Sequence, residues 1–185
     1  MKIYTRTGDD GTTGLLYGGR VRKDDLRTDT YGGVDEAVAA IGLARSLGPA
    51  GEGLAALLLD LQRELFVVGA ELATATENAG KLRPGVSKVT ADMVARLEET
   101  IDRLTSVAPL PDYFVVPGAC PVSAALDLAR SVVRRSERSA AALQREGMLA
   151  DPVVLRYLNR LSDLLFVAAR YEEQCRGLQA PPSHE

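Results

Sequence analysis

The sequence predicts an all-α protein, an up-and-down bundle of five helices that follows an extended N-terminal segment. From about Arg27 onward, apolar residues recur at three- to four-residue spacing, which is the periodicity of amphipathic helices. Pairs containing proline or glycine interrupt this pattern, and the alternation typical of strands is nearly absent. Because the interruptions are short, consecutive helices are expected to run antiparallel.

The first two helices precede a polar loop. The first is expected from about Arg27 to Gly48-Pro49, a pair that cannot continue a helix. The second is expected from about Glu52 to Thr76, because leucines and valines mark one continuous stripe along it. The segment Glu77 to Gly85 is polar and contains glycine, and this composition predicts a mobile loop.

Three further helices complete the predicted bundle. Their expected ranges are 91–107, 121–146 and 152–176. A short extended piece, Tyr113 to Val116, precedes the second of them. Asp151-Pro152 suits the start of the third, because proline fits the first turn of a helix. We predict a single domain over residues 1–178 and a disordered tail over residues 179–185.

Composition excludes several classes of protein. The formal net charge of −3 over 185 residues argues against a nucleic-acid binder held by bulk electrostatics. No apolar run approaches the length that crosses a bilayer, and the first residues lack the apolar core of a secretory signal. Cys120 and Cys175 lie far apart, which is typical of a reduced protein. We therefore expect a cytoplasmic protein with neither a nucleic-acid nor a membrane partner.

The single histidine narrows the chemistry. His184 lies in the predicted tail, so acid–base catalysis by imidazole and a histidine-ligated metal site are not expected. A ferritin-like di-iron centre is set aside because its Glu-x-x-His pairs are missing. Any reaction must therefore depend on carboxylates, basic groups, backbone amides or a bound cofactor.

The N-terminal segment is the first candidate for chemistry. Residues 5–14 are rich in Gly, Thr and charged residues, and glycine lets backbone amides approach phosphate oxygens while hydroxyl groups and cations add donors. The stretch Gly14 to Arg20 approaches a Walker A loop, but Arg20 and Val21 stand where that loop needs Lys and Ser or Thr. Alone, the segment fits a phosphate-binding loop or a flexible N-terminal arm.

Two helices carry regular polar stripes. Arg130, Arg134 and Arg138 are four residues apart, and like charges at this spacing repel, so an anionic partner is expected. Glu137 offers part of it, Asp35 of the first helix is another candidate, and a solvated basic face is the alternative. On the last helix, Asn159 stands in a polar stripe that suits a nucleotide or is an ordinary exposed face.

Taken in order, these segments resemble the propanediol-utilisation type of ATP:cob(I)alamin adenosyltransferase. The resemblance runs from about Lys2 to Glu172. The matching motifs are Thr5-Arg6-Thr7-Gly8-Asp9 through Lys23, Tyr31-Gly32 through Asp35-Glu36, Arg130 through Arg134-Arg135-Ser136-Glu137-Arg138, and Leu158-Asn159-Arg160-Leu161-Ser162-Asp163. The chain departs from the family at Asp10, where lysine is common, and at Gly14, where a polar residue is usual.

The resemblance implies roles for individual residues. A homotrimer of five-helix subunits would bind ATP and cobalamin between neighbours, with Asp35 and Arg130 as a charge pair across the subunit boundary and Phe114 against the corrin, where it displaces the lower axial ligand. The residues implied for the triphosphate are Thr5, Arg6, Thr7, Gly8, Thr13 and Lys23. The residues implied for the rest of the nucleotide and Mg²⁺ are Arg134, Arg135, Glu137 (the metal ligand), Arg138 and Asn159.

The implied reaction needs no general base. The reduced cobalt attacks the 5′ carbon of ATP and expels triphosphate, giving adenosylcobalamin for hand-off to an enzyme that depends on it, so the protein supplies orientation and charge stabilisation. By occupying the place of the lower axial ligand, a Phe114 side chain wedged against the corrin would favour four-coordinate cobalt, which is easier to reduce. The alternatives are a non-catalytic nucleotide or cobalamin carrier or sensor on the same bundle and, more remotely, a structural helical oligomer.

Overall fold

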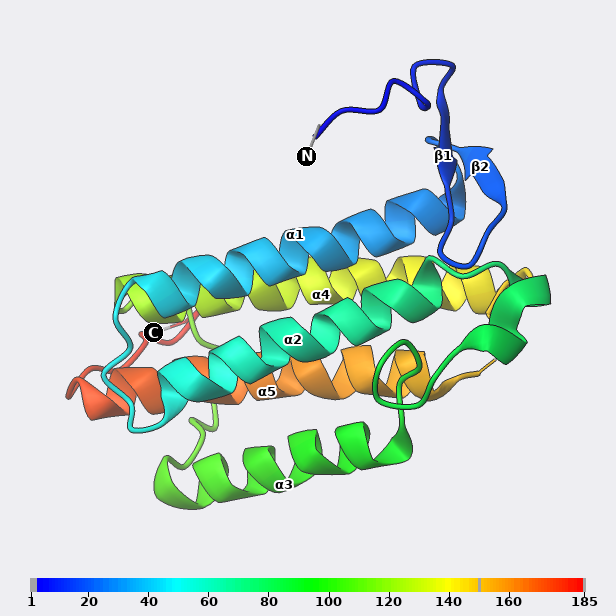
Figure 1. The fold of residues 1–185 in the computed structure, drawn as a ribbon. Helices are drawn as coiled ribbons and strands as arrows, with labels where there is room; N and C mark the ends of the chain where they lie inside the picture. The colour runs from blue at the N-terminus through cyan, green and yellow to red at the C-terminus, as the bar shows by residue number, and fades with distance from the viewer. Residues whose placement is uncertain (1–2, 150, 185) are drawn as a thin grey trace.

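The computed structural model describes residues 3–149 and 151–184, so Lys2, where the resemblance begins, and Glu185, at the end of the predicted tail, lie outside it. Figure 1 shows long helices packed side by side, with a small hairpin at one end. The five long helices are α1 (Leu26–Ser46), α2 (Leu54–Leu72), α3 (Ala91–Val107), α4 (Pro121–Arg145) and α5 (Val153–Cys175). Successive helices alternate in direction (Figure 1), which confirms the predicted up-and-down fold.

Local sequence explains where the helices begin. The Asp25 side chain accepts a hydrogen bond from the backbone N–H of Arg27 at the start of α1, and Thr90 does the same for Met93 at the start of α3. Gly53 takes a left-handed conformation with φ 71° directly before α2, a conformation that glycine adopts without strain. These signals place the helix ends within a few residues of the predicted positions.

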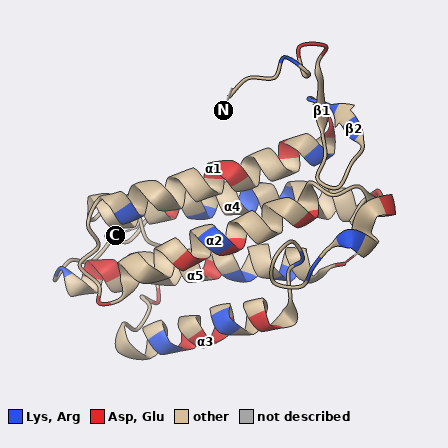
Figure 2. Ribbon diagram, in the orientation of Figure 1, with Lys and Arg blue, Asp and Glu red and all other residues tan. Residues whose placement is uncertain are grey.

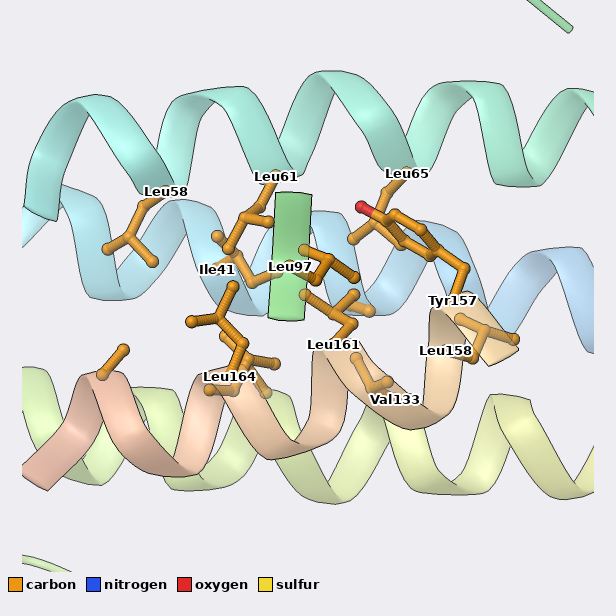
Figure 3. Close-up of a cluster of buried hydrophobic side chains, with 14 of the residues drawn as sticks. Ile41, Leu58, Leu61, Leu65, Leu97, Val133, Tyr157, Leu158, Leu161 and Leu164 are labelled. Carbon is orange, nitrogen blue, oxygen red and sulfur yellow. The ribbon is translucent and has the colours of Figure 1, made fainter. Parts of the chain in front are cut away.

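The core lies between α1, α2, α4 and α5. α4 packs against both α1 and α5, and α3 packs against the outside of α5. Figure 3 shows the apolar side chains interlocking, with Ile41, Leu61 and Leu161 at the centre. Each is at most 2% exposed, and burial of one such side chain stabilises the fold by about 1.5–3 kcal/mol.

The N-terminal segment ends in a hairpin at one end of the bundle. β1 (Thr12–Gly14) pairs antiparallel with β2 (Arg20–Arg22), and Thr13 lies opposite Val21. Residues 3–5 extend beyond the hairpin (Figure 1), and Ile3 is 98% exposed. The described part of this segment therefore contributes little to the core.

The polar loop after α2 has more structure than its composition predicts. Residues Thr76–Lys81 form the 3₁₀ helix η1. Asn78 and Lys81 donate hydrogen bonds to the backbone oxygens of Gly18 and Tyr17, each at 3.2 Å, and the Tyr17 hydroxyl lies 3.0 Å from Ser87 Oγ. The loop thus satisfies polar groups of the hairpin turn, to which it is not adjacent in sequence.

The C-terminal segment differs from the expected disordered tail. Backbone N–H groups of Val116 and Ser183 donate to the oxygens of Pro181 and Phe114 at 2.8 and 2.7 Å, and Ala180 is 1% exposed. Residues 180–183 therefore run beside the extended piece that carries Phe114. Composition alone predicts disorder because the pairing partners, Phe114 and Val116, lie 69 and 65 residues before Ser183 and Pro181.

A polar cluster closes the hairpin end of the bundle. The Arg27 guanidinium is buried and donates to the backbone oxygens of Leu72, Thr74 and Met148 at 2.8, 2.7 and 2.6 Å. Glu71 is 4% exposed and accepts a hydrogen bond from the Val89 N–H at 2.6 Å. Burial raises the pKa of Glu71 to about 7.

The helices were also compared with the length and hydrophobicity of membrane-spanning segments. In the part of the chain that the structure describes, no helix meets both requirements.

Candidate functional site

The glycine-rich segment brings a lysine against the backbone. A Cβ added at Gly8 would lie 2.9 Å from the Thr12 oxygen and 3.2 Å from the Lys23 Cε, so only glycine fits there. The Thr5 and Thr7 hydroxyls lie 2.8 Å apart, and Arg6 between them takes a left-handed φ of 61°. Hydroxyls, a cation and a tight backbone turn are thus gathered within one exposed loop, which is suited to phosphate oxygens.

Asp10 has a structural role in this loop. Its carboxylate accepts hydrogen bonds from the Thr12 N–H and Thr12 hydroxyl at 2.9 and 2.7 Å and lies 3.8 Å from Arg20. Arg20 in turn donates to the Thr7 oxygen at 2.6 Å. Asp10 and Arg20 therefore order the turn that follows Thr5 and Thr7. The hydrogen bonds from Thr12 hold the pKa of Asp10 below its usual value.

The arginines of α4 point into two different grooves. Arg130 and Arg134 line a groove of about 670 Å³ between α3, α4 and α5, which we call the α4–α5 groove. Arg135 lines a second groove of about 760 Å³ together with Lys23, and it forms an ion pair with Glu36 of α1. Figure 2 shows basic residues spaced along α4 and acidic residues on the adjoining α1. Two arginines of the predicted basic face, Arg130 and Arg134, therefore share one groove, whereas the adjacent Arg135 faces another.

Glu137 and Asn159, which the resemblance assigns to the same nucleotide site, are in contact. The Asn159 side-chain amide donates to a Glu137 oxygen at 3.0 Å, and the Asn159 oxygen accepts from Arg160 at 2.7 Å. Arg160 also binds Glu98 of α3 at 2.8 Å. This chain of hydrogen bonds joins the Glu137 carboxylate of α4 to α5 and α3. On the same helix as Glu137, the Arg138 guanidinium donates to the Arg134 backbone oxygen at 3.1 Å.

The residue types fit a magnesium–nucleotide complex better than a protein-only metal site. No group of three or more metal-binding side chains occurs among the described residues. Mg²⁺ usually takes one or two carboxylates and completes its coordination with substrate phosphates and water. Glu137 can supply one such carboxylate, and Arg134 and Arg138 of the same helix are cations suited to the phosphates.

Asp35 and Phe114 are exposed, and among the described residues neither side chain forms a hydrogen bond or an ion pair with these arginines. Asp35 lines an apolar groove of about 430 Å³ between α1 and α2, which also contains Phe66 and which we call the α1–α2 groove. Phe114 is 85% exposed. The described residues contain no hydrogen bond or ion pair between Asp35 and Arg130, whose Nε lies 3.2 Å from Asp127 Oδ1. The predicted site residues are therefore not all brought together within a single subunit.

Sequence reasoning overlooked Asp127 and Arg170. Both are buried and form an ion pair at 2.7 Å between α4 and α5. An acidic residue within the apolar run Leu126 to Ala129 was the available signal, because a buried carboxylate needs a cationic partner. Which cation pairs with it depends on how the two helices pack.

Comparison with known proteins identifies the family. The family model described as cobalamin adenosyltransferase matches residues 3–172. The chain is 45% identical over 181 residues to a corrinoid adenosyltransferase of Bacillus subtilis, covering 96% of this chain and 90% of that protein. A corrinoid adenosyltransferase of Mycobacterium leprae is 42% identical over 172 residues, covering 91% of this chain and 90% of that protein.

A solved structure agrees with these relatives. It is a phenylalanine-to-histidine variant of the PduO-type ATP:corrinoid adenosyltransferase from Lactobacillus reuteri, complexed with cobalamin and ATP. It superposes with a TM-score of 0.89 at 34% identity and covers 100% of this chain and 97% of that one. This chain belongs to the cobalamin adenosyltransferase family, and its likeness is to the PduO type.

Proposed function

We propose that this protein transfers the 5′-deoxyadenosyl group of ATP to the cobalt of cob(I)alamin, forming adenosylcobalamin and triphosphate. The observation that carries the proposal is the uncommitted positive charge on α4. Among the described residues, the Arg134 guanidinium has no hydrogen-bond acceptor, although it lines a groove that could admit a nucleotide. Its neighbours Glu137 and Asn159 offer a carboxylate for Mg²⁺ and an amide for the nucleotide.

The proposed site is completed by a second copy of the chain. Asp35 and Arg130 line different grooves of one subunit, so a contact between them requires two different faces to meet. Such a contact is head-to-tail, and head-to-tail contacts form closed rings when the rotation permits. A homotrimer satisfies this requirement and would place the α1–α2 groove of one subunit against the α4–α5 groove of the next.

The proposed roles follow from the residues on each face. Thr5, Arg6, Thr7, Gly8, Thr13 and Lys23 would hold the triphosphate as it leaves. Arg134, Arg135 and Arg138 would stabilise the charge that develops on it. Phe114 is exposed and would pack against the corrin face, where an apolar ring provides no axial ligand. When bound, cobalamin supplies the nucleophile, and the chain orients it toward the 5′ carbon of ATP.

The proposal also includes the cellular location of the protein and the use of its product. A cytoplasmic location suits the reaction, because cob(I)alamin needs a reducing compartment. Hand-off to an enzyme that depends on adenosylcobalamin is the natural use of the product. A carrier or sensor on the same bundle is the competing function, since binding of ATP and cobalamin does not require turnover.

The deciding experiment is anaerobic. The protein is mixed with ATP, Mg²⁺ and chemically reduced cobalamin, and the absorption spectrum is followed. Conversion to the adenosylated form with release of triphosphate is expected. If cobalamin and ATP bind but the spectrum of verified cob(I)alamin does not change, the protein is a carrier. Omission of Mg²⁺ should slow the reaction, which tests the role of Glu137.

A further inference from the structure

Asp127 is a buried acidic residue of α4 to which the proposed reaction gives no role. Its side chain is 3% exposed. Its Oδ1 accepts a hydrogen bond from Arg130 Nε at 3.2 Å, and its Oδ2 accepts from Arg170 Nη2 at 2.7 Å. A carboxylate at this depth is costly unless it is paired with positive charge. One carboxylate thus holds two cations where α4 packs on α5.

Glu173 balances the second cation. Its oxygens accept from Arg170 Nε and Nη2 at 2.8 and 2.9 Å, and its side chain is 2% exposed. The group of Asp127, Arg130, Arg170 and Glu173 is therefore neutral overall, and we call it the α4–α5 charge cluster. Glu173 contacts Arg170 but makes no hydrogen bond to Arg130 in the described structure, so the two buried carboxylates have different effects on Arg130.

Arg130 is held at its inner end and free at its outer end. The Phe166 ring centroid lies 5.9 Å from the Arg130 guanidinium carbon and 5.0 Å from that of Arg170, a favourable cation–π distance. Among the described residues, Arg130 donates its Nε hydrogen bond to Asp127 and leaves both Nη groups without an acceptor. Its side chain is 29% exposed and lines the α4–α5 groove.

We propose that Asp127 is a positioning residue that fixes the Arg130 fork so that its two Nη groups receive an anionic partner across the subunit boundary. The inference rests on the proposed function, in which that partner is Asp35 of the neighbouring subunit. A guanidinium binds a carboxylate best through two parallel N–H groups in a fixed plane. Anchoring Nε beforehand reduces the rotamer entropy lost when the pair forms.

Two matched variants separate positioning from burial. Asp127→Asn and Glu173→Gln each remove one buried carboxylate from Arg170, but only the first also changes the support of Arg130. With pre-reduced cobalamin and ATP, Asp127→Asn should lower kcat/KM about ten-fold, the effect of one hydrogen bond between charged groups. Glu173→Gln should leave it within about two-fold. Equal losses in the two variants would show that the cluster serves stability alone.

A double-mutant cycle supplies the second readout. Lysine at position 130 cannot make the Nε hydrogen bond, so Asp127→Asn should cause no further loss in the Arg130→Lys background. Fully additive losses would overturn the inference. Should Asp127→Asn fail to fold, Asp127→Glu keeps the charge while displacing the carboxylate, and its activity should still fall below that of Glu173→Gln.

A failure of the positioning role of Asp127 can be distinguished from a failure of the proposed function. If the wild-type protein converts no cobalamin, the proposed activity fails, and the same variants are then compared by sedimentation over a dilution series. Weaker association of Asp127→Asn than of Glu173→Gln would support the positioning role independently of turnover. Identical dissociation curves would remove it.

Discussion

Glu71 offers a sharp test of the energetics at the hairpin end of the bundle. Its carboxyl group is buried and its pKa rises from an ordinary value of 4.5 to about 7. Between these values the folded protein keeps a proton that the unfolded chain has released, so the free energy of unfolding falls as the pH rises. The loss begins near pH 4.5 and is complete above pH 7.

The size of this loss follows from the displacement of the pKa. Each pKa unit corresponds to about 1.4 kcal/mol, and allowance for partial screening by solvent gives an expected loss of about 2 kcal/mol. Glu71→Gln removes the ionisation and can still accept the hydrogen bond from Val89. The variant should therefore be the more stable protein at pH 8 and nearly equal to the wild type at pH 5.

Urea unfolding at pH 5 and pH 8 measures the effect, at one fixed protein concentration because association also stabilises the folded state. Glu99→Gln is the matched control, since Glu99 is exposed on α3 and its loss should alter neither value by more than about 0.5 kcal/mol. The same pH dependence in wild type and Glu71→Gln would refute the assignment of the buried titration to Glu71.

Four other predictions address the site and the fold. Phe114→Ala should remain active when the reaction starts from cob(I)alamin but lose activity when it starts from cob(II)alamin. Equal activity from both starting states would exclude the proposed packing of Phe114 against the corrin. Arg134→Ala should weaken ATP binding about ten-fold or more by calorimetry, and unchanged affinity would exclude its role. Asp35→Arg should dissociate the oligomer in sedimentation, with Arg130→Asp restoring it; no rescue argues against the pair. Arg27→Met should lower the unfolding free energy by about 3 kcal/mol, since three buried carbonyls lose a charged donor; a smaller loss than about 1 kcal/mol would contradict that account.

The helices were predictable because their signals are local. The α3 range was predicted at residues 91–107, since Thr90 caps it and apolar residues mark its face. The η1 helix and the C-terminal pairing were not, because their stability comes from partners distant in sequence. Asn78 depends on Gly18, and Ser183 depends on Phe114. Composition carries no record of such partners.

The candidate site, like the fold, could be predicted from the sequence only in part. The sequence indicated the glycine–threonine loop and the arginines of α4, and the resemblance added Glu137 and Asn159; their functional roles stay predictions. It could not show that Arg134 and Arg135 face different grooves, because adjacent residues of a helix point about 100° apart and the packing of α1 and α5 decides where each direction leads. It also missed Asp127, whose partner Arg170 lies on another helix.

The exposed N-terminal loop differs from α4 in how much of the apolar core depends on it. Its described residues bury little apolar surface, so substitutions there should leave the core intact, whereas substitutions of the buried residues of α4 should weaken it. The loop is also held locally, because its turn is ordered by Asp10 together with Thr12 and Arg20. If this loop binds the triphosphate as proposed, substitutions in the loop alone can change the contacts to the leaving group while the helical bundle stays the same.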